Sequence, residues 1–358
     1  MIPVIDMHCD TIALIGASRD QRKNAASKGG KGYSFYVTEE ELVNGIDLRS
    51  NKRMIDLLRM KGSDYMCQCF ALYVSEEAAV TAGMDMFSYL IYLSDIFDEL
   101  TGANSDLIKP VLTGSDIEKN YKEGYMSALK TVEEGFPYGG KTENLYEMYR
   151  RGVRKSTLTW NFENELAFPN PVPERETDTV NGLKKAGFDF IEAMENMGMI
   201  IDISHLNDAG IMDIFSVIKP ETPIVASHSN ARGVCSHHRN LSDEMLKKLS
   251  DHGGVTGINF CPSFLNESLV ESKKISAADR VSRIDDMIEH MKYIRNAAGI
   301  DVIALGSDFD GISGTLEVDG CGEIQKIAQA MDRAGFSDED IEKVFYANAL
   351  RVYKEVLG

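Results

Sequence analysis

The chain has 358 residues, of which 43% are hydrophobic and 26% charged, and its formal net charge is -18. This composition is typical of a folded globular protein and excludes a disordered or collagen-like chain. The acidic excess argues against nucleic acid or a membrane surface as partner, because phosphate groups are bound by basic surfaces. A small-molecule or peptide substrate is expected instead.

The first residues lack the basic region of a secretory signal, and Asp6, His8 and Asp10 interrupt their apolar run. No stretch is long and apolar enough to span a bilayer, and the final residues lack the apolar tail of a lipid-anchor signal. The six cysteines are scattered and do not form a disulfide framework. A cytoplasmic protein is therefore expected, with Cys67 and Cys69 as reduced thiols of the core.

Eight short apolar runs bounded by turn residues predict β-strands. In chain order they cover residues 3–9, 64–74, 126–133, 153–160, 199–205, 223–228, 254–260 and 302–308. Amphipathic stretches between them predict helices, for example over 178–198 and after Ser337, a good N-cap residue. Strands that alternate with helices predict a parallel sheet covered by helices.

Eight alternations without an internal linker predict one α/β domain over residues 1–358, a (β/α)8 TIM barrel. A doubly wound open sheet is the less favoured alternative, because no glycine-rich phosphate turn follows the first strand. Three long polar stretches, 18–33, 163–178 and 263–280, follow strand carboxyl ends. Barrel loops on that side build active sites, so each stretch is either a surface loop or part of a lid.

Coordinating side chains recur where the predicted strands end. Asp6, His8 and Asp10 alternate along the first strand and therefore point to one face. The others are Glu133, His205, His228 and Asp308. Each alone has an ordinary explanation, as a helix cap or a hydrogen-bonded core histidine. A closed barrel, however, brings all of its strand carboxyl ends onto one rim, so these residues are expected to converge.

Three histidines and up to four carboxylates form a ligand set suited to zinc or a similar divalent cation. One metal needs only three or four ligands, so the surplus favours two metals that share a bridging carboxylate. The GxSxG motif of serine hydrolases is absent. The sequence thus favours water activated by metal over a serine nucleophile.

Six motifs in order resemble the membrane (renal-type) dipeptidase family, peptidase family M19, of the metal-dependent hydrolase superfamily. They are DMHCDT, TVEEG, GVRKSTLTW, GMIIDISHLND, ASHSNARGVCSHHRNLSD and GSDFDGI, and the resemblance covers nearly the whole chain. It implies a zinc-dependent dipeptidase that holds two Zn²⁺ ions bridged by a glutamate and cleaves dipeptides with a metal-bridging hydroxide. Relatives accept D-residues at the C-terminal position and form dimers, so the same substrates and a homodimer are expected here.

Carried onto this chain, the resemblance implies His8 and Asp10 as ligands of one zinc ion, His205 and His228 as ligands of the other, and Glu133 as the bridge. Glu133 is preferred to its neighbour Glu134 because it continues the strand in the family's register. Asp308 resembles the carboxylate that holds the bridging water and moves its proton. Arg239 resembles the arginine that pairs with the free carboxylate of the substrate, a bidentate task for which lysine is a poor substitute.

One departure from the family concerns the end of the fourth predicted strand, where Trp160 replaces a histidine that contacts the substrate carbonyl. Indole donates one hydrogen bond but cannot take a proton, so polarisation of the carbonyl falls to a metal or to Asn161. Trp160 and Asn161 are therefore expected at the substrate.

Four other polar residues carry weaker expectations. Asp6 either orients a ligand or faces a polar layer of the barrel. His237 and His238 are expected at the rim or at a helix start rather than on the metals, and either could line the substrate pocket. His252 and His290 are expected on the surface of the outer helices. Two rival functions stay open: another binuclear hydrolase that acts on a cyclic amide, lactone, β-lactam or phosphoester, and a non-catalytic metal-binding barrel.

Overall fold

The computed structural model describes residues 1–24, 37–171, 176–270, 275–276 and 279–358. Eight parallel strands form a closed ring in the order β2, β1, β10, β8, β7, β6, β5, β4 and back to β2. Their bounds are β1 (Val4–Cys9), β2 (Tyr65–Tyr73), β4 (Met126–Glu133), β5 (Lys155–Thr157), β6 (Ile200–Asp202), β7 (Val225–Ala226), β8 (Val255–Ile258) and β10 (Ile303–Leu305). The predicted (β/α)8 barrel is confirmed, and the open-sheet alternative is wrong.

All eight predicted strands are present, and three further strands were not predicted. β3 (Ile108–Pro110) pairs with β4 alone, while β9 (Val281–Ser282) and β11 (Thr315–Leu316) form a separate two-stranded sheet. The later barrel strands are shorter than predicted, because their polar carboxyl ends leave the ladder and turn into the loops that carry the site.

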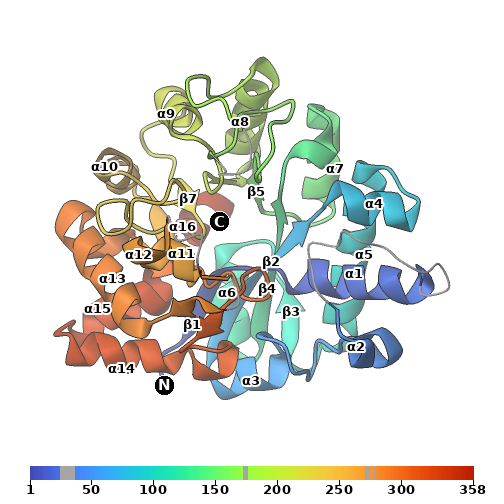
Figure 1. Ribbon diagram of the computed structural model, residues 1–358, viewed down its shortest axis with the longest axis horizontal. Helices are drawn as coiled ribbons and strands as arrows, with labels where there is room; N and C mark the ends of the chain where they lie inside the picture. The colour runs from blue at the N-terminus through green and yellow to red at the C-terminus, as the bar shows by residue number, and fades with distance from the viewer. Residues whose placement is uncertain (25–36, 172–175, 271–274, 277–278) are drawn as a thin grey trace.

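Helices surround the ring of strands (Figure 1). They are α1 (Thr11–Asn24), α2 (Glu39–Asn44), α3 (Leu57–Gly62), α4 (Glu76–Ala82), α5 (Met86–Ala103), α6 (Gly114–Lys122), α7 (Thr142–Arg150), α8 (Lys185–Met197), α9 (Asp208–Val217), α10 (Asp243–Asp251), α11 (Pro262–Leu265), α12 (Glu267–Val270), α13 (Ile284–Ala298), α14 (Gln325–Arg333), α15 (Asp338–Glu342) and α16 (Asn348–Leu357). Ser337 caps α15 as predicted, accepting a hydrogen bond from the Asp340 amide. Among the described helices, none combines the length and apolarity needed to cross a membrane.

The helix predicted over 178–198 begins only at Lys185. Before it, Gly182 packs so closely against α9 that an added Cβ would lie 2.6 Å from the Gly210 amide nitrogen. The Leu183 amide donates to the Asp213 carboxylate at 2.8 Å, and Val180 is exposed. Tertiary contacts therefore hold this segment out of the helix.

The three polar stretches are only partly described. Residues 18–24 continue α1 rather than forming the predicted loop, and 263–270 contains most of α11 and all of α12. Residues 25–33, 172–175, 271–274 and 277–278 of the predicted stretches lie outside the described residues.

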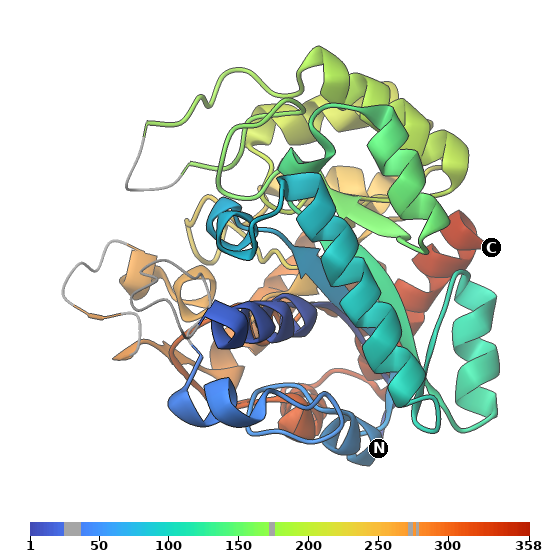
Figure 2. The same ribbon diagram turned by 90° about the vertical axis from the view of Figure 1, so that its right-hand side faces the viewer.

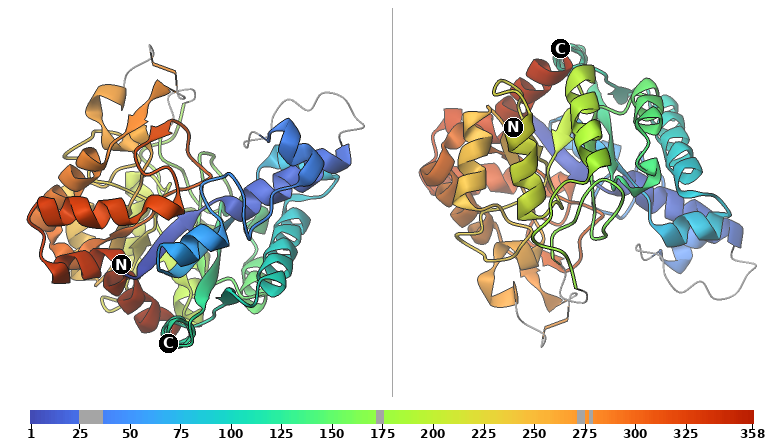
Figure 3. Two further views of the ribbon diagram at one scale, coloured as in Figure 1. Left: turned by 90° about the horizontal axis from the view of Figure 1, so that it is seen from below. Right: turned by 90° about the horizontal axis from the view of Figure 1, so that it is seen from above.

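The barrel interior is a small apolar core closed at one end by α16. Strand residues such as Ile5, Leu129 and Val255 pack there against Val352 and Tyr353 of α16. Figures 2 and 3 show α16 (red) at one end of the barrel and the orange segment of α11 and α12 at the opposite end. The strands run away from α16, so their carboxyl ends open at the end that carries the candidate site.

Candidate metal centre and substrate pocket

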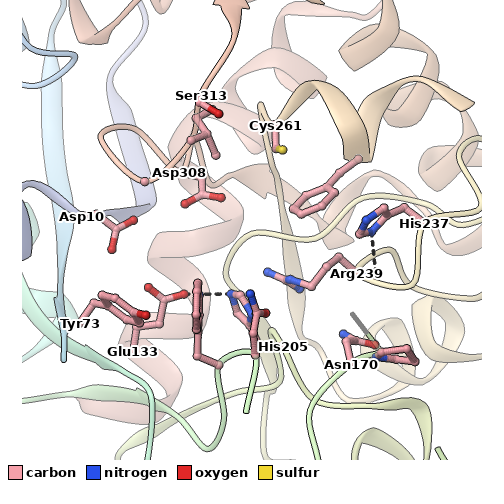
Figure 4. A pocket seen from close by; sticks show the side chains of 16 residues that line it. Asp10, Tyr73, Glu133, Asn170, His205, His237, Arg239, Cys261, Asp308 and Ser313 are labelled. Atoms are coloured by element: carbon pink, nitrogen blue, oxygen red, sulfur yellow. Dashed lines mark hydrogen bonds and ion pairs between the residues drawn. The ribbon is translucent and has the colours of Figure 1, made fainter. Parts of the chain in front are cut away.

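The five predicted metal ligands and the predicted catalytic residue Asp308 converge at the carboxyl ends of the strands. They come from β1 and its end (His8, Asp10), the last residue of β4 (Glu133), and the segments that follow β6 (His205), β7 (His228) and β10 (Asp308). Five are at most 7% exposed, and the Asp308 side chain is 13% exposed. Figure 4 shows the labelled members of this group facing a common space.

Glu133 lies in the middle of the group, and its two oxygens face different partners. Its Oε1 is 2.9 Å from His205 Nε2 and 3.5 Å from His228 Nε2, while its Oε2 is 3.3 Å from His8 Nε2. One carboxylate therefore joins two groups of residues. We name them the first half-site (His8, Asp10 and Asp308) and the second half-site (His205 and His228). The neighbouring Glu134 turns away, since its carboxylate accepts from the amides of Phe136 and Trp160 and from the Asn164 side chain.

The first half-site gathers carboxylates around His8. Its Nε2 is 3.5 Å from Asp10 Oδ2 and 3.8 Å from Asp308 Oδ1, and it is buried without a hydrogen-bond partner. An added Cβ on Gly311 would lie 2.0 Å from Asp10 Oδ2 and 2.8 Å from Asp308 Oδ1. A residue without a side chain is thus required for these two carboxylates to sit as they do.

The second half-site joins two imidazoles. His205 Nε2 and His228 Nε2 are 2.9 Å apart. Their other ring nitrogens face Asn161 Oδ1 at 3.2 Å and Ser227 Oγ at 2.8 Å, which orients both rings. Two ring nitrogens and a carboxylate oxygen converge here as the ligands of a zinc-type ion do.

Burial governs the electrostatics of the group. It lowers the pKa of His205 to about 4 and that of His228 well below its usual range, which favours the neutral, metal-binding form. Burial and the charge of Glu133 raise the pKa of Asp10 well above its usual range, and burial raises the pKa of Asp308. Burial also opposes charge on His8, but the carboxylates of Glu133 and Asp10 together outweigh it and raise the pKa of His8 well above its usual range.

These features fit a bound cation. Single ligand atoms of His8, Glu133 and His228, and of His8, Asp10 and Asp308, lie within 4.8 Å of one another in each group. A divalent cation would give His8 Nε2 a partner and relieve the repulsion among three buried carboxylates. The donors are imidazole nitrogens and carboxylate oxygens, the set that zinc and similar metals prefer.

Two buried aspartates, Asp6 and Asp202, accept hydrogen bonds from the segments that carry the half-site residues. Asp6 accepts from the amide and hydroxyl of Ser307 at 2.9 and 2.6 Å and from the His8 amide at 3.3 Å, so it orients the segments that carry His8 and Asp308. Asp202, which sequence reasoning missed, accepts from the amides of Ser204 and Ser227, each at 3.0 Å. The sequence did offer one indication of Asp202, because it lies in a predicted strand three residues before His205.

Backbone conformation also marks the site. His205 and Asp308 have φ values of 71° and 64°, in the left-handed region that non-glycine residues seldom adopt. Strain of this kind collects at functional sites, where the surrounding contacts hold it in place. Asn259, another residue not anticipated, donates to Asp308 Oδ2 at 2.9 Å and fixes that carboxylate.

A cavity of about 550 Å³ opens beside the metal-site residues and is lined by Arg239, Trp160 and Asn161 as predicted. Arg239 is 5% exposed and forms no ion pair among the described residues. Its Nη atoms donate to Ser229 Oγ and the His228 carbonyl at 3.3 Å, and its Nε has no hydrogen-bond partner there. A buried guanidinium of this kind is suited to an anionic ligand.

Trp160 stands beside His205. Its ring centroid is 6.1 Å from that of His205, 4.9 Å from Tyr73 and 5.6 Å from Phe162. The adjacent Asn161 reaches His205 Nδ1. Trp160 therefore forms a wall of the cavity, and Asn161 orients a candidate metal ligand.

The remaining histidines behave differently from one another. His237 lines the cavity and His238 is exposed, so both lie at the rim as expected. His252 is partly exposed and packs against Phe215. The surface position predicted for His290 is wrong, because its ring is fully buried, accepts from the Ala231 amide and bonds to the Leu265 carbonyl.

Comparison with known proteins gives a consistent result. The sequence model described as membrane dipeptidase (peptidase family M19) matches residues 1–357. The dipeptidase aclJ of Aspergillus oryzae is 30% identical over 331 residues, which cover 90% of this chain and 75% of that protein. A solved structure named dipeptidase AC superposes with a TM-score of 0.81 at 22% identity, covering 100% of this chain and 99% of its own.

A second solved structure is a metallopeptidase from Rhodobacter sphaeroides liganded with a phosphinate mimic of the dipeptide L-Ala-D-Ala. It superposes with a TM-score of 0.79 at 22% identity and covers 99% of each chain. At this level of identity, the two structures establish that the fold is shared.

Proposed function

This chain belongs to the membrane dipeptidase family, peptidase family M19, and is a metallo-dipeptidase; from that premise we propose that it works with two zinc ions bridged by Glu133. The observation that carries the proposal is the central position of Glu133, whose two oxygens face His8 on one side and the pair His205 and His228 on the other. A shared carboxylate is how paired metal ions are usually held together.

The half-sites assign the ligands. His8 and Asp10 would hold one ion, His205 and His228 the other, and Glu133 both. When bound, such ions supply Lewis acidity that polarises the substrate carbonyl and lowers the pKa of water by several units, toward ~7.

Asp308 is proposed to handle the proton. Its Oδ1 faces the His8 half-site while its Oδ2 is held by Asn259, so one oxygen stays oriented toward the reacting atoms. Asp308 accepts the proton of the attacking water and returns it to the amine that leaves. Burial raises its pKa, which makes the carboxylate a better base than an exposed aspartate.

Arg239 is proposed to bind the free carboxylate of the dipeptide. Its guanidinium lines the cavity without an ion-pair partner in the described part of the chain, and a substrate carboxylate would provide that partner. The Rhodobacter neighbour, liganded with a mimic of L-Ala-D-Ala, supports substrates with a D-residue at the C-terminal position. A cytoplasmic location and a homodimer complete the proposal, supported by the sequence expectations alone.

The test is metal content together with hydrolysis of dipeptides of mixed chirality. The proposal expects two zinc ions per chain, cleavage of L-Ala-L-Ala and L-Ala-D-Ala, and much slower cleavage of tripeptides. Metal binding with hydrolysis of lactones or cyclic amides, and none of dipeptides, would assign the site to the rival hydrolase class. A chain that binds no metal would contradict the site itself.

A further inference from the structure

A second cavity, of about 430 Å³, adjoins the first and plays no part in the chemistry described so far. The two cavities share Tyr73 and Trp160 in their linings. The rings of these residues are 4.9 Å apart and tilted by 57°, so they form a common aromatic partition. The side cavity therefore shares an aromatic wall with the catalytic cavity.

The side cavity lies opposite Arg239 across the barrel mouth. Tyr73 ends β2, and Arg239 belongs to the segment that follows β7. Round the closed ring β2 reaches β7 through β4, β5 and β6 in one direction and through β1, β10 and β8 in the other, four steps either way. Figure 4 likewise shows Tyr73 and Arg239 on opposite sides of Glu133 and His205. A dipeptide whose carboxylate sits at Arg239 therefore directs its N-terminal residue toward Tyr73.

The lining combines apolar walls with an acidic rim. Val74, Met86, Phe136 and Phe162 supply apolar surface, and Phe162 is 43% exposed although its ring packs on Trp160. The acidic and basic residues of the lining are all glutamates, with no lysine, arginine or histidine among them. A ligand must therefore offer an apolar stem and no negative charge.

The glutamates are not equivalent. Glu134 is buried and its carboxylate is occupied by three donors, and Glu163 pairs with Lys184 at 2.7 Å. Glu76 and Glu77 are exposed and form no ion pair among the described residues. They open the first turn of α4, whose N-cap Ser75 also lines the cavity. These two carboxylates are free to meet a cation that enters along the apolar wall.

We propose that this side cavity is the subsite for the side chain of the N-terminal residue, and that it selects long side chains that end in a cation, such as lysine, over acidic ones. The inference rests on the proposed dipeptidase function and on the carboxylate position at Arg239. Phe162 and Met86 would contact the aliphatic stem, while Glu76 and Glu77 would attract its ammonium group. The same carboxylates would repel a glutamyl side chain.

The test compares kcat/KM for Lys-Ala, norleucyl-Ala and Glu-Ala, with Ala-Lys as a substrate that carries the cation on the other residue. The wild type is expected to prefer Lys-Ala over norleucyl-Ala and to disfavour Glu-Ala most. In Glu76→Gln/Glu77→Gln the ratio of Lys-Ala to norleucyl-Ala should fall about tenfold, as two partly exposed ion pairs allow. A ratio measured on one preparation does not depend on how much of a variant is folded.

The matched control is Glu192→Gln/Glu289→Gln, which removes two exposed charges from α8 and α13, away from the cavity. It should leave the ratio unchanged. Equal rates for Lys-Ala and Glu-Ala, or a ratio that is the same in both double variants, would overturn the subsite while leaving the dipeptidase intact. Failure to cleave any of these dipeptides would overturn the proposed function, and the inference with it.

Discussion

At the scale of single residues, a variant of Asp308 tests the proposed proton transfer separately from metal binding. Replacement by asparagine keeps the shape and the contact partner Asn259 but removes the group proposed to take a proton. We expect kcat of Asp308→Asn to fall by about 10²- to 10⁴-fold, the usual contribution of a positioned base. Metal content, measured by elemental analysis of the same samples, should stay at the wild-type level. A variant that keeps wild-type kcat would remove Asp308 from the mechanism.

The role of Arg239 is tested by removing its guanidinium and, separately, by removing the carboxylate of the substrate. Arg239→Met should lower kcat/KM for free dipeptides by roughly 10- to 100-fold, because a charge-assisted hydrogen bond is lost. Dipeptide amides, which lack the carboxylate, should be cleaved equally by the variant and the wild type. If both enzymes treat the amide and the free acid alike, the carboxylate is bound elsewhere.

Gly311 is a residue whose role no sequence motif made evident. A methyl group there would lie 2.0 Å from Asp10 Oδ2, so Gly311→Ala should displace that carboxylate and lower metal content together with activity. A displacement of about 1 Å at a catalytic site can cost about 10²-fold in rate. Gly102→Ala is the control, since nothing lies within 4 Å of a Cβ added there in α5. Unchanged metal content in Gly311→Ala would contradict the assigned position of Asp10.

At the scale of elements, a buried ion pair between the neighbouring strands β5 and β6 lies beneath the site. Lys155 of β5 donates to the Met7 carbonyl of β1 at 2.8 Å and to the Asp202 carboxylate of β6 at 3.1 Å, with both charged residues 1% exposed. Asp202 in turn holds the segments that carry His205 and His228 through two amides. The pair therefore links three strands beneath the candidate metal ligands.

Removing one member of this pair should destabilise the fold strongly. Lys155→Met leaves Asp202 charged and buried, which typically costs about 3–5 kcal/mol in the free energy of unfolding. The double variant Lys155→Met/Asp202→Asn should recover part of that loss because no unpaired charge remains. Urea unfolding of both variants checks this. A single variant as stable as the wild type would show that the pair is not a major contributor.

His290 of α13 gives a prediction about acid stability. Burial lowers its pKa to about 4 in the folded chain, whereas an unfolded histidine titrates near its usual value of about 6.5. Below pH 6.5 the unfolded chain takes up the proton first, so stability present above that pH is lost as the pH falls toward 4. The loss from this residue is about 2 kcal/mol at pH 5. His290→Gln should therefore show a smaller drop in unfolding free energy between pH 7.5 and pH 5 than the wild type; an equal drop would refute the assignment.

At the scale of the whole molecule, the eight-strand alternation was readable from the sequence because parallel barrel strands are continuous apolar runs bounded by turns. The strand-end histidines and acids were readable for the same reason, since a barrel places those ends on one rim. His8 and Asp308, 300 residues apart, are neighbours only through closure of the ring between β1 and β10.

Other features were beyond the sequence because they depend on tertiary contacts. The late start of α8 follows from the close packing of Gly182 on α9, and the burial of His290 follows from the segments that pack over α13. The Lys155–Asp202 pair joins residues of separate strands, and a lysine in an apolar run gives no indication of its partner. The side cavity between Trp160 and α4 likewise appears only when two distant loops are brought together.

The central claim is that one carboxylate, Glu133, joins two metal half-sites in a single catalytic unit. Its most direct test is a titration of the metal-free protein with zinc while hydrolysis of L-Ala-D-Ala is followed. The account predicts that activity rises to its plateau at two equivalents of zinc per chain, and that Glu133→Gln neither binds the second ion tightly nor reaches this activity. Full activity at one equivalent, or a Glu133→Gln variant that titrates like the wild type, would contradict it.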